Sequence, residues 1–212
     1  MSTTRPLRQD AARNRDRLVA AAREVFRSRG VDAPLEEIAR AAGVAIGTLY
    51  NRFPSRGELI DAALAPLAQH AVEQAERAAR ADDPWQGFAS YVEGTCVLFA
   101  GDRGFAGVYR SRVPGTPGIA AARQRLGKLK AAIMTRAKAA GVLREDVEPA
   151  DVVLLIWSIA ATIDATRDTA PDAWRRQLAL VLDGLRPDAA HPLPAPPPAF
   201  GQLMNATPGQ HG

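Results

Sequence analysis

Residues 35–58, LEEIARAAGVAIGTLYNRFPSRGE, predict two short helices joined by a tight turn. Ile38, Ala39 and Ala42 recur at helical spacing, and the apolar stripe resumes after Gly43. Glycine suits this turn because it has no Cβ and tolerates a left-handed backbone. Small residues at the crossing let the two helices pack closely, which is typical of a helix-turn-helix.

The outward positions of the second predicted helix favour contact with DNA. They are short or hydrogen-bonding groups with no acid among them, which suits entry into the major groove. These positions are Ala45, Gly47, Thr48, Tyr50, Asn51 and Arg52.

The charge of the chain is concentrated in the same region. The net charge is +4, and residues 1–60 carry 11 arginines against 7 acids, whereas residues 61–212 are neutral overall. Eight of the arginines lie within residues 1–29. A basic end of this kind favours a polyanionic partner such as the phosphate backbone, and the alternative is a solvated charged face.

Composition predicts an all-α protein, and we expect it to be located in the cytoplasm. The 212 residues are rich in alanine and leucine and poor in aromatic side chains. Cys96 is the only cysteine, so no internal disulfide can form and a reducing compartment is expected. No signal peptide is recognisable, and the longest near-apolar run, residues 152–163, is too short for a bilayer that needs about 20 residues. We therefore expect no membrane association.

Beyond the central stretch the pattern predicts further helices and two irregular segments. The predicted helices cover residues 11–29, 56–80 with a bend at Pro66, 85–100, 108–112, 119–140, a run from about 149 and 171–185, and a flexible connector covers 101–107. Arg123, Arg125, Lys128, Lys130, Arg136 and Lys138 are expected to form a basic outer surface on the helix over 119–140.

The last two predicted helices are apolar on more than one face, so a second copy of the chain is expected to cover them in a four-helix packing. The protein is therefore predicted to be a homodimer. The candidate interface residues are Val153, Trp157, Trp174, Leu178, Val181 and Leu185.

The string IARAAGVAIGTLYNRFPSRGEL closely resembles the DNA-binding region of the tetracycline-repressor (TetR) family of bacterial transcriptional regulators. The matching pieces are Ile38-Ala39, Ala42-Gly43-Val44, Gly47-Thr48-Leu49-Tyr50, Phe53, Arg56 and Glu58-Leu59. The resemblance implies a dimer of all-α subunits, each with a three-helix DNA-binding head and a ligand-binding body. It also implies release from a palindromic operator by a small molecule.

Carried over by position, the resemblance assigns Thr48, Tyr50 and Asn51 to the groove or its phosphates. It assigns Arg56 and the N-terminal arginines, including Arg13, to the DNA backbone. Gly47 would allow close approach, and Ala45 could touch a thymine methyl group. This chain departs from the family in having Ala45 where serine is frequent. It also has Pro34-Leu35 where a capping hydroxyl is common.

The resulting domain prediction has four parts. They are a mobile basic arm over 1–10, a helix-turn-helix domain over 11–55, a ligand-binding and dimerisation domain over 56–186, and a disordered proline-rich tail over 187–212. The candidate ligand pocket combines aromatic surface with a few polar tips. Its residues are Tyr91, Thr95, Phe99, Phe105, Tyr109, Met134 and Trp157.

Two rival functions stay open. One is a DNA-binding regulator or activator without a small-molecule ligand. The other is a helical enzyme, which is disfavoured because His70 is the only histidine outside the tail and no catalytic set can be assembled. No metal site and no cofactor are expected.

Overall fold

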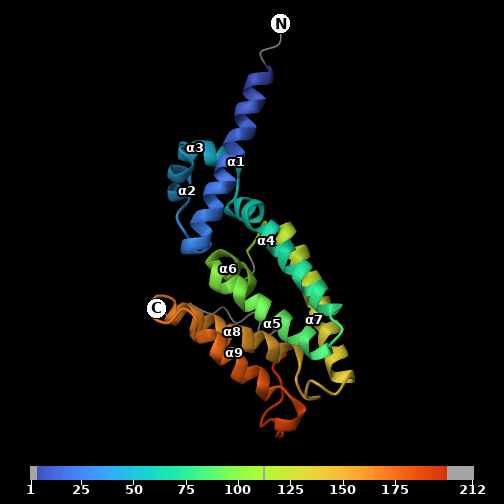
Figure 1. Ribbon diagram of the computed structural model, residues 1–212. Coiled ribbons are helices and arrows are strands. Elements are labelled where there is room, and N and C mark those ends of the chain that lie inside the picture. Colours follow the sequence, from blue (N-terminus) through green and yellow to red (C-terminus); the bar gives the residue numbers. More distant parts are fainter. Residues whose placement is uncertain (1–3, 112, 200–212) are drawn as a thin grey trace. The chain divides into compact units, whose positions relative to one another are not determined.

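The computed structural model describes residues 4–111 and 113–199, with the side chains of residues 13–111, 113–188 and 190–199. All regular structure in these ranges is helical, so the all-α prediction is confirmed (Figure 1). The helices are α1 (Thr4–Arg29), α2 (Leu35–Ala42), α3 (Ile46–Arg52), α4 (Arg56–Ala79), α5 (Pro84–Gly101), α6 (Arg103–Arg110), α7 (Pro117–Ala139), α8 (Pro149–Thr166), α9 (Ala173–Gly184) and the short 3-10 helix η1 (Pro187–Ala189).

The chain divides into two compact units. Unit 1 comprises Met1–Ala68 and Asp102–Ala121, and unit 2 comprises Gln69–Gly101 and Ala122–Gly212. The helix-turn-helix therefore shares its unit with the first half of α4, with α6 and with the start of α7. This compact unit is larger than the predicted head over 11–55.

The core of unit 1 is built on one face of α1. Leu18, Ala22 and Phe26 follow one another at intervals of four residues and are fully buried. Such spacing places them on one side of a helix, where α2 and α6 pack against α1. Ile38 of α2 and Leu49 of α3 complete this core and are also 0% exposed.

The turn between α2 and α3 has the predicted geometry. Gly43 adopts the left-handed conformation with φ 66°, and its N–H donates to the carbonyl of Arg40. The N–H of Val44 donates to the carbonyl of Ala39, which closes the C-terminus of α2. Pro34 provides no side-chain cap for α2, as expected from the absence of a hydroxyl at this position.

The predicted mobile arm and the predicted flexible connector are both corrected. Helix α1 begins at Thr4 rather than near residue 11, so most of the arm over 1–10 is helical, while residues 1–3 lie outside the described residues. Helix α6 begins at Arg103 because Asp102 caps it, with Oδ1 accepting the N–H of Phe105 at 2.7 Å. A capping aspartate outweighed the glycines that suggested a connector.

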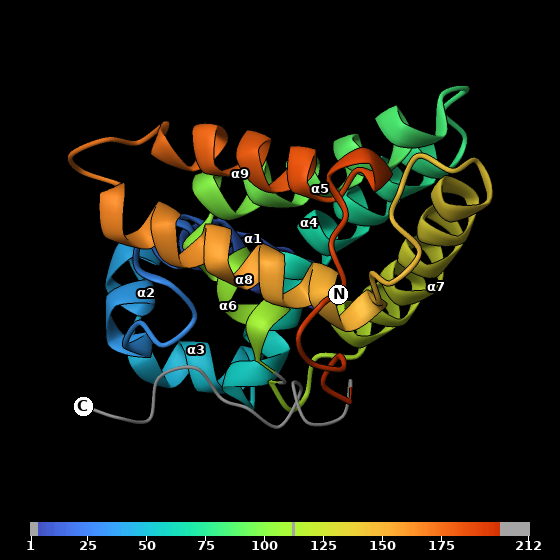
Figure 2. The ribbon, with the colours of Figure 1, turned by 90° about the horizontal axis from the view of Figure 1, so that it is seen from below.

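Unit 2 is a layer of long helices held at their ends by arginines. In its interior α5 packs against α8, and α8 packs against α9 along the length visible in Figure 2. Arg136 of α7 donates to the carbonyl of Ala79, the last residue of α4, and to that of Asp82 in the loop that follows. Arg167 donates to the carbonyl of Ala100 near the end of α5. The bonds to Ala79 and Ala100 satisfy carbonyls that helix C-termini leave unpaired.

The predicted basic surface of α7 is wrong at Lys130. This side chain is 6% exposed, and its Nζ donates to the carbonyl of Pro149 at 3.0 Å. Burial lowers the pKa of Lys130 to about 8. Arg125 is paired with Glu76 of α4, so it too has a partner within the unit.

Among the described residues one helix, α8, is long and apolar enough by length and composition to cross a membrane. The apolar run over 152–163 lies within this helix, which is longer because it extends past the flanking Asp151 and Asp164. Buried residues recur along α8, including Val152, Ile156 and Ile163, which is the pattern of a core helix in unit 2.

The start of the proline-rich tail is ordered rather than disordered. Residues 187–189 form η1, and the carbonyl of His191 accepts a hydrogen bond of 2.6 Å from Arg144. The same guanidinium pairs with Asp146, and the Arg186 guanidinium lies 4.1 Å from the ring centre of Trp85. Residues 200–212 lie outside the described residues.

Candidate nucleic-acid interface

The exposed surface of α3 is the candidate DNA-reading element. Ala45, Gly47, Asn51 and Arg52 are exposed, Tyr50 is 49% exposed, and Thr48 is half-buried. An added Cβ at Gly47 would meet nothing within 4 Å, so the backbone there is open to a close partner. The outward positions predicted from the sequence therefore do face away from the core of unit 1.

Ile46 belongs to the same surface and was missed by the sequence analysis. It is 36% exposed at the first position of α3, whereas an isoleucine in an apolar stripe is expected inside. The available signal was its position at the start of the predicted helix, right after the turn. A side chain in the first turn of a helix need not lie on the same face as the apolar residues that follow it. An exposed apolar group can contact a thymine methyl in the major groove.

The opposite face of α3 is held by the core. Leu49 is fully buried and Phe53, which ends the helix, is 3% exposed. The Arg15 guanidinium of α1 lies 5.3 Å from the ring centre of Phe53, a cation–π contact. Helix α3 is thus fixed along its inner side, and its seven residues cannot roll without breaking these contacts.

Arg56 has an internal role that the sequence did not suggest. One Nη atom donates to the carbonyls of Val31 and Ala33, at 2.9 and 2.8 Å, so the side chain ties the start of α4 to the loop before α2. One half of the predicted capping box is present, because the N–H of Glu58 donates to Ser55 Oγ at 3.2 Å; the Ser55 hydroxyl in turn donates to the Glu58 carboxylate at 3.4 Å. Any phosphate contact by Arg56 would be made from this anchored position.

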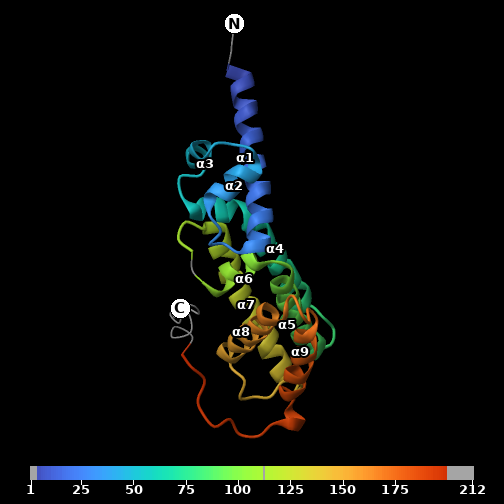
Figure 3. The same cartoon turned by 90° about the vertical axis from the view of Figure 1, so that its left-hand side faces the viewer.

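Arg13 is exposed on α1, ahead of the part of this helix that packs in the core. Figures 1 and 3 both show the N-terminal turns of α1 extending past α2 and α3. Within unit 1 this places the basic start of α1 beyond the end of the helix-turn-helix. Arg13 lies on the exposed part of the helix, as a phosphate contact requires.

The seven candidate pocket residues are divided between the two units. Phe105 and Tyr109 lie on α6 in unit 1, with ring centres 6.2 Å apart. The others lie in unit 2: Tyr91, Phe99 and Met134 are buried, Thr95 is half-buried with Oγ1 bonded to the carbonyl of Tyr91, and Trp157 is half-buried. The pocket stays a prediction.

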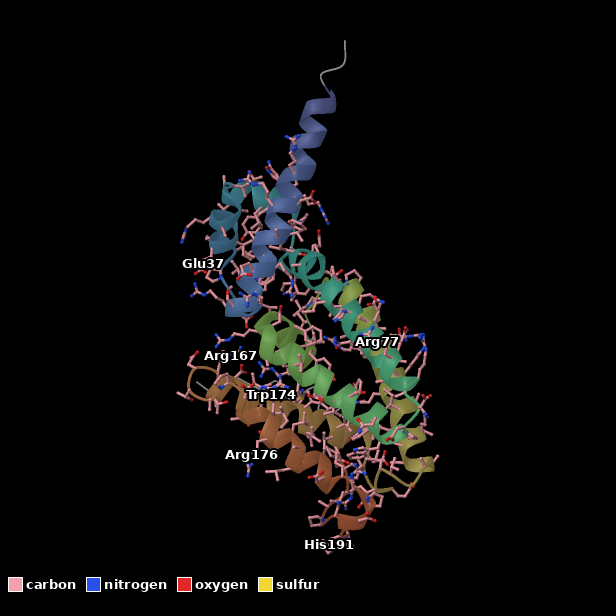
Figure 4. The ribbon with its side chains drawn as sticks, in the orientation of Figure 1. Glu37, Arg77, Arg167, Trp174, Arg176 and His191 are labelled. Carbon is pink, nitrogen blue, oxygen red and sulfur yellow. The ribbon has the colours of Figure 1, made fainter. Side chains whose placement is uncertain are left out.

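The candidate interface residues include side chains that pack inside their own subunit. Trp174 and Leu178 are 1% and 3% exposed, and Figure 4 shows Trp174 on the inner side of α9 while Arg176 points outward. Such buried side chains have little surface to offer a second copy. Val153 is also buried, in a small cluster with Ala150 and Trp157. Val181 and Leu185 are half-buried on the same helix pair.

Two exposed apolar side chains of α8 and α9 were not among the predicted interface residues. Leu180 is 64% exposed and Leu154 is 40% exposed. In addition, Nε1 of Trp157 and Oε1 of Gln177 are buried and find no hydrogen-bond partner among the described residues. Burying such atoms unpaired costs free energy.

The Cys96 thiol is buried in unit 2. Burial, followed by the charge of Glu93, raises the pKa of the Cys96 thiol to about 12, so it stays protonated near neutral pH. In the part of the chain that the structure describes, no three His, Cys, Asp or Glu side chains are grouped to hold a metal ion.

Comparison with known proteins agrees with the geometry of α2 and α3. Residues 18–63 match the family model of bacterial regulatory proteins of the tetR family, and residues 83–187 match the C-terminal domain of SbtR-like transcriptional regulators. The chain is 34% identical to the TetR transcriptional regulator SCO0520 from Streptomyces coelicolor, with 82% of this chain and 98% of that chain covered and a TM-score of 0.55. The chain belongs to the TetR family of transcriptional regulators. The protein is therefore a DNA-binding transcriptional regulator.

Two curated HTH-type transcriptional regulators resemble this chain over part of its length. The regulators TtgW and SrpR of Pseudomonas putida are each 45% identical over 65 residues, which is 30% of this chain. The matches span 48% and 30% of those proteins. Among solved structures, FadR from Bacillus subtilis in complex with stearoyl-CoA has 19% identity and a TM-score of 0.62 over 82% of this chain and 98% of that chain, a likeness of fold alone.

Proposed function

We propose that this TetR-family regulator is a cytoplasmic repressor, released from a palindromic operator when a small molecule binds. The observation that carries the DNA half of this proposal is the exposed surface of α3. It presents Tyr50, Asn51 and a bare backbone at Gly47 on a helix whose inner side is fixed by Leu49 and Phe53. A rigidly supported helix with hydrogen-bonding groups and no acid is suited to reading base edges.

A palindromic operator follows from a homodimer. Leu154 and Leu180 of α8 and α9 are exposed, and the unpaired Nε1 of Trp157 lies on the same helix pair. A second copy packed on these helices would cover the apolar groups and could supply the missing partner. Two recognition helices must then lie about 34–36 Å apart to enter successive major grooves.

The effector half of the proposal is supported by structural neighbours. Crystal structures of FadR with stearoyl-CoA and of RolR with resorcinol have folds similar to this chain. Those two ligands differ greatly in size and polarity, so the shared fold supports a small-molecule effector without defining its chemistry. A ligand would shift the population of subunit geometries away from the one that spans two grooves.

The first experiment is selection of bound duplexes from a random-sequence DNA pool by the full-length protein. An inverted repeat should be enriched, with half-sites one helical turn apart or a multiple of it. Replacing Asn51 with alanine should cost about 1–3 kcal/mol of binding to the selected operator and leave random-sequence duplex unaffected. Equal losses on both kinds of DNA would show that Asn51 does not read a base.

The second experiment separates the repressor from a regulator without a ligand. A metabolite library is screened for compounds that release the fluorescent operator duplex from the wild-type protein. A compound that releases the operator supports the repressor. The same compound should not release a random-sequence duplex that the protein binds at low salt. A library-wide failure, together with unchanged thermal stability, would favour the regulator that acts without a small molecule.

A further inference from the structure

The segment 102–121 lies between the two parts of unit 2 along the chain, but it packs within unit 1. It contains Asp102, α6, the loop over 113–116 and the first turns of α7. The helix-turn-helix itself lies between α1, which precedes it, and α4, which follows it. The described contacts of this segment fall on both of these flanking helices.

On the α1 side, three consecutive residues make close contacts. The side chain of Asp102 is buried, and its carboxylate pairs with Arg23. Arg103 donates to the carbonyl of Ser28 at 3.3 Å, near the end of α1. At Gly104 an added Cβ would come within 2.9 Å of Phe26 Cβ, so α6 lies directly against α1.

On the α4 side, the contacts are made by the first turns of α4, which follow α3 in the chain. An added Cβ at Gly57 would be 1.9 Å from the carbonyl oxygen of Pro114, which means that the loop touches the backbone of α4. The carboxylate of Asp61 accepts the N–H groups of Gly118 and Ile119 at 3.1 and 2.9 Å. Both acceptors of one carboxylate therefore hold the first turn of α7 on α4.

We propose that the segment 102–121 is a brace of the DNA-binding unit, and that Gly57 and Asp61 are positioning residues for operator recognition. The brace joins α1 to the start of α4 and so limits how the two helices can turn relative to each other. Helix α3 ends four residues before Arg56, so a displacement of the start of α4 moves the end of α3. The proposal rests on the proposed recognition of an operator by α3.

Gly57→Ala is the sharpest test because its effects on the helix and on the brace have opposite signs. Alanine favours a helix more than glycine does, so α4 itself should gain from the change. The new Cβ nevertheless cannot coexist with the carbonyl of Pro114, and the loop must move away. Gly127→Ala in α7 is the matched control, because an added Cβ there meets nothing within 4 Å.

Affinity is measured for an operator selected from random DNA by the wild-type protein, and for a random-sequence duplex. Gly57→Ala should weaken operator binding by about tenfold, the worth of one well-placed base contact, with little change on random DNA. Asp61→Ala, which removes both acceptors and retains a good helix former, should act in the same direction. Gly127→Ala and Glu73→Ala, at an exposed position of α4, should bind the operator like the wild type.

Hydrogen exchange of the α3 amides, measured without DNA, gives an independent readout. These amides should exchange faster in Gly57→Ala and Asp61→Ala than in the two controls. Wild-type operator affinity and wild-type α3 exchange in both variants would overturn the brace. If Gly57→Ala does not fold, Asp61→Ala decides. If the wild-type protein selects no operator, the proposed function fails, while the exchange rates still decide whether the brace holds α3.

Discussion

Replacing Asp102 with alanine removes the carboxylate that joins α1 to α6. Oδ1 of Asp102 accepts the N–H of Phe105 at 2.7 Å and so caps α6. The other oxygen pairs with Arg23, whose side chain is 34% exposed, while that of Asp102 is 5% exposed. One small substitution therefore removes a helix cap and one half of an ion pair.

The expected cost is the sum of two separable losses. Loss of an aspartate cap costs about 1 kcal/mol. A fully buried ion pair broken on one side costs about 3–5 kcal/mol, but the Arg23 side chain reaches solvent, so we expect about 1–2 kcal/mol from the pair. Asp102→Ala should thus lower the free energy of unfolding by about 2–3 kcal/mol.

The assay is urea denaturation followed by far-ultraviolet circular dichroism, with Asp102→Asn as the dissecting variant. Asparagine keeps an acceptor for the N–H of Phe105 and loses the negative charge, so it should recover about 1 kcal/mol of the loss. Glu24→Ala, which breaks an exposed ion pair with Arg27, is the control and should leave the denaturation midpoint unchanged. Stability within about 0.5 kcal/mol of wild type for Asp102→Ala would refute the reasoning.

Three further predictions follow from single positions. Lys130→Met should raise the free energy of unfolding near pH 7 by about 1–3 kcal/mol, because burial lowers the pKa of Lys130 to about 8 in the folded chain. In pH-dependent denaturation this gain should fade as the pH rises from about 8 through the ordinary lysine value of 10.5, above which both states hold a neutral amine; a constant gain would contradict it. Gly43→Ala should cost about 1–2 kcal/mol in thermal or urea denaturation, since φ is 66° and the new Cβ would lie 2.8 Å from Arg17 Nη2, and a cost near zero would show that the turn can relax. Leu180→Glu should halve the particle mass in light scattering towards the 22.6 kDa monomer, because a charge would replace an exposed apolar contact; an unchanged dimer would place the interface elsewhere.

The helix-turn-helix was predictable because its signals are local. The apolar spacing of Ile38, Ala42 and Leu49 and the glycine at position 43 depend on backbone geometry within a few residues. The resemblance to TetR proteins rests on the same stretch. The outward side chains of α3 followed from that periodicity, and only Ile46, at the irregular first turn, escaped it.

Other errors arose where a local signal competed with a distant partner. The glycines over 101–107 suggested a connector, but α6 starts at Arg103, where Asp102 caps it and pairs with α1. Lys130 was assigned to a basic surface, because its periodicity gives no sign of the Pro149 carbonyl that it meets. Trp174 and Leu178 were assigned to an interface between copies, and their side chains are buried within the subunit, while the interface itself stays a prediction.

The sequence by itself determined the helical class, the helix-turn-helix and the basic character of the N-terminal segment, because helix periodicity, turn chemistry and charge are encoded by neighbouring residues. Only the tertiary structure decided that residues 102–121 belong with the DNA-binding unit, that Arg56 serves the loop before α2, and that Asp61 holds the start of α7. These contacts join residues 23 to 79 positions apart, and no pattern along the chain records which carbonyl or N–H group a distant side chain will meet.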